Sequence, residues 1–99
     1  MAKVILRQKA IDDLNEIWHY TRVEWSESQA DRYYEMLKMA CKGIGDNPDV
    51  GKQYFAISKD LLGLKSGKHI LFYQQISSQR IEILRILHER MDLKNRIIE

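Results

Sequence analysis

The stretch Arg80–Asp92 constrains the fold more than any other part of the chain. Its first nine residues contain five aliphatic side chains: Ile81, Ile83, Leu84, Ile86 and Leu87. Isoleucines that recur at every second or third place are typical of a β-strand. A strand this rich in aliphatic side chains is expected to be covered on both faces, which predicts a central strand. The polar residues after it, His88 to Asp92, are then displayed from the middle of the molecule.

Two amphipathic helices are predicted before this strand. Apolar residues at steps of three and four indicate one helix over residues 8–25 and a second one beginning at Ser26. Ser26 is expected to cap the second helix, and Gly45 to end it shortly before Pro48. Because almost no linker separates the two helices, they must fold back as an αα-hairpin. Their apolar stripes need a third surface, since neither helix is stable alone.

The second half of the chain predicts that surface. Strands are expected at Asp60–Ser66, Lys68–Ile76 and Arg80–His88, joined by short turns into an antiparallel meander. Lys3–Arg7 is expected to join the sheet, and residues 47–59 to have only local structure. The order predicts an α+β fold: a helical hairpin on one face of a small, mainly antiparallel sheet of three to four strands, with the other face open. We expect residues 1–99 to form a single domain.

Composition excludes several classes of protein. The chain has no run of about 18 apolar residues, no signal-peptide pattern and a single cysteine, Cys41. No histidine or cysteine spacing is typical of a zinc site, and the glycines form no phosphate-binding loop, so we expect no metal and no cofactor. These features fit the cytoplasm of a cell.

Charge is distributed unevenly along the chain. The net charge is +2, but residues 1–50 hold seven basic and nine acidic residues, whereas residues 51–99 hold nine and five. The basic second half favours an acidic partner, although such a charge is also ordinary for a solvated surface.

Two groups of charged residues are candidates for chemistry. Asp12, Asp13 and Glu16 are interpreted as a solvated helix face that complements the helix dipole, rather than as an acid cluster. The meander carries a basic group that would suit a phosphodiester if its members converged: Lys65, Lys68, His69, Arg85, His88 and Arg90. The alternative is that Lys65 and Lys68 only flank a hairpin turn in water. Arg85 interrupts an apolar strand, so it is either paired inside the fold or aimed across the open face.

Three segments together resemble the ParE branch of the ParE/RelE toxin superfamily. They are Ala10–Tyr20, the sequence Ser-Gly-Lys-His-Ile-Leu-Phe-Tyr at 66–73, and the Arg-Ile-Leu-His-x-x-Met-Asp segment at 85–92. The resemblance covers nearly the whole chain in order and spacing. It implies a toxin of a type II toxin–antitoxin system, one that poisons DNA gyrase and is neutralised by a ParD-like antitoxin.

The resemblance leaves a second activity open, because RelE-like relatives cleave mRNA. Those nucleases combine basic residues with a tyrosine or its equivalent after the last strand, and here no tyrosine follows Tyr73. His88 is the candidate substitute, so the nuclease alternative would use Lys65, Lys68, Arg85 and His88. A relative that has lost toxicity and only binds an antitoxin is a third hypothesis.

We therefore predict a toxin that is not an enzyme, with two sets of functional residues. Target inhibition is assigned to the end of the last strand: Arg85, His88, Arg90, Met91 and Asp92. Antitoxin binding is assigned to an apolar face: Leu14, Trp18, Tyr34, Leu37, Tyr54, Phe55 and Tyr73. A homodimer and a heterotetramer with the antitoxin are both compatible with this hypothesis, and no sequence-specific DNA binding by the toxin alone is expected.

Overall fold

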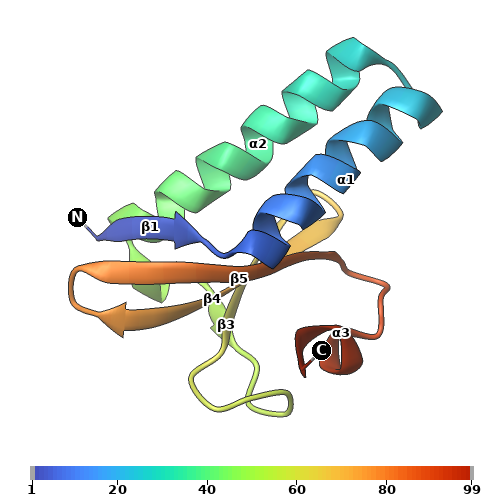
Figure 1. Cartoon of the computed structure of the whole chain (residues 1–99). Helices are drawn as coiled ribbons and strands as arrows, with labels where there is room; N and C mark the ends of the chain where they lie inside the picture. The colour runs from blue at the N-terminus through green and yellow to red at the C-terminus, as the bar shows by residue number, and fades with distance from the viewer. Residues whose placement is uncertain (1, 99) are drawn as a thin grey trace.

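The computed structural model describes residues 2–98 and contains three helices, one short 3₁₀ turn and five strands (Figure 1). In chain order they are β1 (Lys3–Leu6), α1 (Gln8–Glu24), α2 (Glu27–Asp46), η1 (Pro48–Val50), β2 (Lys52–Gln53), β3 (Leu62–Ser66), β4 (His69–Ser77), β5 (Arg80–His88) and α3 (Leu93–Ile98). None of the helices in this part of the chain has the length and apolar content needed to cross a membrane.

The strands form one sheet in the order β1-β5-β4-β3-β2. Strand β1 runs parallel to β5, and the other neighbours are antiparallel. The α+β class and the meander are therefore confirmed, and β5 is paired on both sides as predicted. The sheet has one strand more than expected, because the two-residue β2 forms inside the connection at 47–59.

The helical hairpin covers one face of the sheet, and α1 and α2 extend together beyond its edge (Figure 1). The core between hairpin and sheet contains residues from α1, α2, β4 and β5: Ala10, Leu14, Leu37, Ile44, Leu71, Tyr73, Ile81, Ile83 and Ile86. The opposite face was expected to be open, and that expectation is wrong in part. There a second cluster, built on Leu61, Ile70, Phe72 and Leu87, is covered by the 54–61 loop and by Leu93 and Ile97 of α3.

A β-bulge divides β5 at the point where β1 ends. Phe72 of β4 is paired with Arg85, but the next residue, Tyr73, is paired with Ile83, so Leu84 is an extra residue in β5. The bulge explains why the isoleucines of this strand are spaced by two and then by three. It also moves Arg85 out of the alternation that would have placed it in the core with Ile81 and Ile83.

The predicted helix and turn signals are only partly correct. The Ser26 side chain accepts a hydrogen bond from the backbone N–H of Gln29 at 3.0 Å, which confirms the N-cap of α2. Gly67 turns the chain between β3 and β4 with φ of 61°, in the left-handed region that favours glycine. Gly45 does not end α2, which continues to Asp46 and is capped by Asn47.

Gly45 is required instead because β1 passes close to α2. A Cβ at this position would lie 2.8 Å from Cγ2 of Val4 and 3.1 Å from the carbonyl oxygen of Ala2. At Gly43, one half-turn earlier in the same helix, nothing lies within 4 Å of an added Cβ. Substitutions at Gly43 and Gly45 therefore separate the effect of helix propensity on stability from the effect of packing.

We predict that Gly43→Ala raises the free energy of unfolding by about 0.5–1 kcal/mol, the gain expected from helix propensity alone. Gly45→Ala has the same gain but is expected to be destabilising overall, because overpacking costs about 1–3 kcal/mol. Urea denaturation of both variants measures the difference. Equal stabilisation by the two substitutions would show that β1 does not constrain this helix.

Candidate functional site

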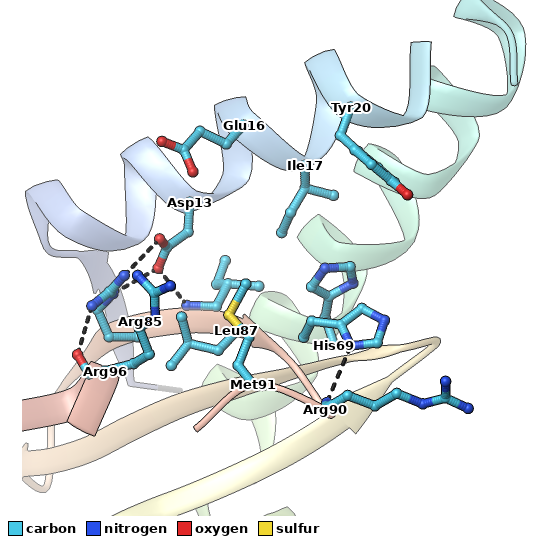
Figure 2. A pocket seen from close by; sticks show the side chains of 12 residues that line it. Asp13, Glu16, Ile17, Tyr20, His69, Arg85, Leu87, Arg90, Met91 and Arg96 are labelled. Carbon is cyan, nitrogen blue, oxygen red and sulfur yellow. Dashed lines mark hydrogen bonds and ion pairs between the residues drawn. The ribbon is translucent and has the colours of Figure 1, made fainter. Parts of the chain in front are cut away.

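A pocket of about 460 Å³ lies between α1, the end of β5 and the C-terminal segment (Figure 2). Helix α1 contributes Asp13, Glu16, Ile17 and Tyr20 to it, and β4 contributes His69. The other lining residues come from β5 and the segment after it: Arg85, Ile86, Leu87, His88, Arg90, Met91 and Arg96. Much of the segment to which we assigned target inhibition therefore lines one concave surface.

One end of the pocket is built by an ion pair between Asp13 and Arg85. Arg85 Nε donates to Asp13 Oδ2 at 2.8 Å and Nη2 donates to Oδ1 at 3.0 Å, which is a bidentate arrangement. The backbone N–H of Ile86 donates to the same Asp13 Oδ2 at 3.0 Å. Arg85 Nη1 donates to the carbonyl oxygen of Arg96 at 2.7 Å, so a single guanidinium joins α1, β5 and α3.

The interpretation of Asp13 as part of a solvated helix face was wrong. Asp13 is only 9% exposed, because it faces the part of β5 that β1 does not cover. Strand β1 ends at Leu6. Past this point the Asp13 carboxylate takes the place of a neighbouring strand, because it accepts a hydrogen bond from the backbone N–H of Ile86 in β5. Asp12, one residue earlier, is exposed as expected and accepts a hydrogen bond from Gln8.

The sequence contains a signal that would have identified Asp13. It lies three residues after Ala10 and four before Ile17, so it falls within the apolar stripe of α1. A carboxylate at such a position needs a partner, and Arg85 is the basic residue that interrupts the apolar run of β5. The carboxylate in the apolar stripe of α1 and the basic residue in the apolar run of β5 are therefore each other's partners.

The middle of the pocket contains two histidines from neighbouring strands. His69 and His88 are paired across β4 and β5, and their rings meet edge to face at 5.3 Å between centroids. Tyr33 of α2 binds His69: its hydroxyl lies 2.6 Å from His69 Nδ1 and accepts the backbone N–H of Lys68 at 2.9 Å. We assign the hydroxyl as the donor to Nδ1. Burial, reinforced by the neighbouring His88, lowers the pKa of His69 to about 4, so it is neutral at pH 7.

The segment after β5 is held by several local contacts. His88 Nδ1 accepts the backbone N–H of Arg90 at 3.1 Å, and Glu89 forms an ion pair with Lys65 at 3.0 Å. The hydrogen bond from Lys65 holds the pKa of Glu89 below its usual range. Asp92 does not line the pocket; its side chain accepts hydrogen bonds from the backbone and side-chain nitrogens of Asn95 at the start of α3.

The four residues of the nuclease alternative do not form one site. Arg85 and His88 line the pocket, but Lys65 and Lys68 do not. Lys65 is bound to Glu89, and Arg85 is bound to Asp13 and the Arg96 carbonyl. His69 was named in the wider basic group and does line the pocket, but as a neutral imidazole.

Three of the residues assigned to antitoxin binding are core residues. Leu14, Leu37 and Tyr73 are buried, because the hairpin uses its apolar stripe on its own sheet. The Tyr73 hydroxyl donates to the Pro48 carbonyl at 2.7 Å and accepts the Gly51 N–H at 2.9 Å, so it stabilises the chain after α2. These three cannot meet a partner while the fold is intact.

The other four members of that set are at least partly exposed, but they lie in two different regions of the molecule. Trp18 Nε1 donates to Asp31 between α1 and α2, and Tyr34 lies on α2. Tyr54 packs against Phe72 in the second cluster, and Phe55 is 68% exposed. They do not form the single apolar face that was predicted.

The described side chains give little basis for a metal site or for a reactive thiol. Among residues 2–98, no group of three or more His, Cys, Asp or Glu side chains could hold a metal ion. Cys41 packs against the first core cluster, and burial raises the pKa of its thiol to about 11. It is therefore protonated and a poor nucleophile at neutral pH.

The fold is shared with a known class of protein. A solved structure of the chromosomal ParDE toxin–antitoxin system from P. aeruginosa superposes with a TM-score of 0.77, covering 89% of this chain and 96% of that one. The identity between them is 18%, so the likeness concerns the fold. The likeness therefore defines a fold class, an α+β fold with a helical hairpin on one face of a mainly antiparallel sheet.

Sequence similarity identifies the family within that class. The family model for the ParE toxin of the type II toxin–antitoxin system parDE matches residues 4–93. Toxin ParE1 of Mycobacterium tuberculosis is 33% identical over 92 residues, covering 93% of this chain and 94% of the relative. Toxin ParE1 of Caulobacter vibrioides is 30% identical, covering 90% and 91%. The chain belongs to the ParE toxin family.

We predict that Asp13→Ala destabilises the protein by about 3–5 kcal/mol, because breaking a buried ion pair by removing one of its partners is strongly destabilising. The Ile86 N–H loses its acceptor at the same time. Asp12→Ala is the matched control and should change stability by less than about 0.5 kcal/mol. Chemical denaturation measures both; similar small effects would mean that the ion pair is dispensable.

We also predict an acid-sensitive contribution from His69. Its folded-state pKa of about 4 lies below the ordinary value of 6.5, so the folded protein binds fewer protons than the unfolded chain between these values. The contribution is present above pH 6.5 and is lost as the pH falls towards 4.

Thermal unfolding between pH 7 and pH 4 measures this contribution. His69→Gln should flatten the pH dependence in this range, whereas His19→Gln, at an exposed position of α1, should leave it unchanged. A wild-type profile that His69→Gln does not alter would contradict the neutral state assigned to His69.

Proposed function

We propose that this ParE-family chain is a toxin that poisons DNA gyrase and is neutralised by a ParD-like antitoxin. The family match over residues 4–93 carries the proposal. The structure supports it by placing His88, Arg90 and Met91 on an accessible surface at the end of a strand that is paired on both sides. A rigid strand that ends in exposed charge suits the insertion of a short segment into a target protein.

We propose further that the toxin acts by binding rather than by catalysis. A ribonuclease of the RelE type would need its cations free to contact a phosphodiester. Here Arg85 is occupied by Asp13 and the Arg96 carbonyl, and Lys65 by Glu89. Two of the cations that the nuclease alternative requires, Arg85 and Lys65, are thus engaged in contacts within the fold.

The cellular location that we propose for the toxin follows from its proposed target. We place the toxin in the bacterial cytoplasm with gyrase, and we assign it a protein antitoxin encoded beside it. The part of the chain after His88 has a structural role as well, because Leu93 and Ile97 cover the second core cluster. Removing everything after His88 would expose that cluster, so point variants are the better probes.

The purified protein is expected to inhibit gyrase supercoiling or to stabilise gyrase-cleaved DNA, and addition of the antitoxin is expected to reverse this effect. Arg90→Ala and Met91→Ala should weaken inhibition without changing the melting temperature, since both side chains are exposed. Agarose gel assays of supercoiling measure the first effect and circular dichroism the second.

Two outcomes would contradict the proposal. Normal supercoiling at excess folded toxin would exclude gyrase as the target. Defined early cuts in mRNA, found by primer extension after induction in cells, would support the nuclease alternative instead. Growth that continues after induction would indicate a relative that has lost toxicity.

A further inference from the structure

Residues His88–Met91 belong to the part of the chain to which we assign target inhibition, and we call them the inhibitory segment. This segment lies against the turn between β3 and β4. The backbone N–H of Glu89 donates to the carbonyl oxygen of Lys68 in this turn at 2.9 Å. The backbone N–H of Arg90 donates to Nδ1 of His88 at 3.1 Å. The conformation of the inhibitory segment therefore depends on where Lys68 and the His88 ring are held.

Tyr33 of α2 binds two adjacent residues of this turn through one hydroxyl group. The hydroxyl accepts the backbone N–H of Lys68 at 2.9 Å and donates to Nδ1 of His69 at 2.6 Å. Tyr33 also lies directly against Gly67, since a Cβ added there would be 2.7 Å from the hydroxyl oxygen and 2.9 Å from ring carbon Cε1. Burial raises the pKa of the Tyr33 hydroxyl, so it keeps its proton at neutral pH and can act as donor and acceptor at once.

The first connection from Tyr33 to the inhibitory segment is the backbone of Lys68. Tyr33 holds the N–H of this residue, and the carbonyl oxygen of the same residue accepts the N–H of Glu89. The Glu89 side chain also forms an ion pair with Lys65, but the Lys65 side chain is 63% exposed. Ion pairs with such exposed lysines contribute little to stability. The backbone hydrogen bond to Lys68 is therefore the stronger candidate for holding Glu89.

The second connection runs through two histidine rings. The hydrogen bond from Tyr33 fixes the ring of His69, which meets the ring of His88 edge to face at 5.3 Å between centroids. The His88 ring in turn accepts the backbone N–H of Arg90. A rotation of the His69 ring would remove the support of the His88 ring and the acceptor of the Arg90 N–H.

We propose that Tyr33 is a positioning residue for target inhibition, and that its hydroxyl fixes the conformation of the inhibitory segment through Lys68 and His69. Tyr33 is not among the residues that line the pocket, so it acts through its neighbours. A segment that is already held in its binding conformation loses less conformational entropy when it meets a target. The inference rests on the proposed function, because it assigns a role in inhibition to a residue away from the inhibitory segment.

Tyr33→Phe tests the proposal, because it removes the hydroxyl and keeps the ring against Gly67. Hydrogen exchange of the Glu89 and Arg90 amides, followed by NMR, is expected to become about tenfold faster, since their supporting hydrogen bonds are weakened. Amides in the middle of β4 and β5 should exchange as in wild type. The toxin concentration that half-inhibits gyrase supercoiling is expected to rise by about tenfold as the segment loses its fixed conformation.

The neighbouring tyrosine provides a matched control. Tyr34 lies on the same helix with the Lys38 ammonium 5.6 Å from its ring centre, and within residues 2–98 its hydroxyl forms no hydrogen bond. Tyr34→Phe should therefore leave the exchange of the Glu89 and Arg90 amides within about twofold of wild type. Melting curves show whether each variant is folded.

His69→Asn separates the two connections and keeps the proposal testable if Tyr33→Phe lowers the melting temperature too far. Asparagine retains an acceptor for the Tyr33 hydroxyl but removes the ring that contacts His88. Exchange of the Arg90 amide is expected to become faster, whereas exchange of the Glu89 amide should stay within about twofold of wild type. Unchanged exchange at Arg90 in this variant would overturn the connection through His69.

The outcomes distinguish this inference from the proposed function. If folded Tyr33→Phe exchanges like wild type at Glu89 and Arg90, the inference is overturned, whatever the gyrase assays show. Faster exchange with unchanged inhibition of gyrase would also overturn it, because the fixed conformation would then not matter for the target. Failure of the wild-type toxin to act on gyrase removes the proposed function, while the exchange measurements still decide whether Tyr33 holds the segment.

Discussion

The contact of Asp13 with Arg85 and the Ile86 N–H is the interaction on which the arrangement of this molecule depends. Strand β1 pairs with β5 only as far as Leu6 and Ile83, so the rest of that edge of β5 lacks a neighbouring strand. A buried backbone N–H without an acceptor is costly. The Asp13 carboxylate supplies the acceptor, and its charge is balanced by the bidentate guanidinium of Arg85.

The same guanidinium also connects the C-terminal part of the chain to the core. Arg85 donates to the carbonyl of Arg96, and Leu93 and Ile97 cover the second apolar cluster. The bulge at Leu84 makes this geometry accessible, because it moves Arg85 away from the helix-facing row of β5. One side chain thus connects helix α1, the end of β5 and α3, and the pocket lies between them.

The use of the apolar stripes explains which surfaces remain for partners. A hairpin of two helices has enough apolar surface to suggest a docking face, but here most of that surface packs against the sheet. Glycine at position 45 allows β1 to approach α2 closely, which completes that burial. Among the side chains that remain exposed are Tyr20, on the outer edge of α1, and Arg90 and Met91, in the segment after β5. These surfaces meet at the pocket.

The sequence by itself determined the two helices, the meander, the central place of β5 and the ParE resemblance, because hydrophobic period and turn residues act locally. Only the tertiary structure decided which groups Asp13 binds, where Arg85 points and which apolar residues stay exposed. Those outcomes depend on a bulge, a strand that ends early and a close approach at Gly45, each of which is a contact between distant segments. The segment after β5 was predicted to be functional from its charge, but its joining with α1 into one pocket required residues about 70 positions apart to meet.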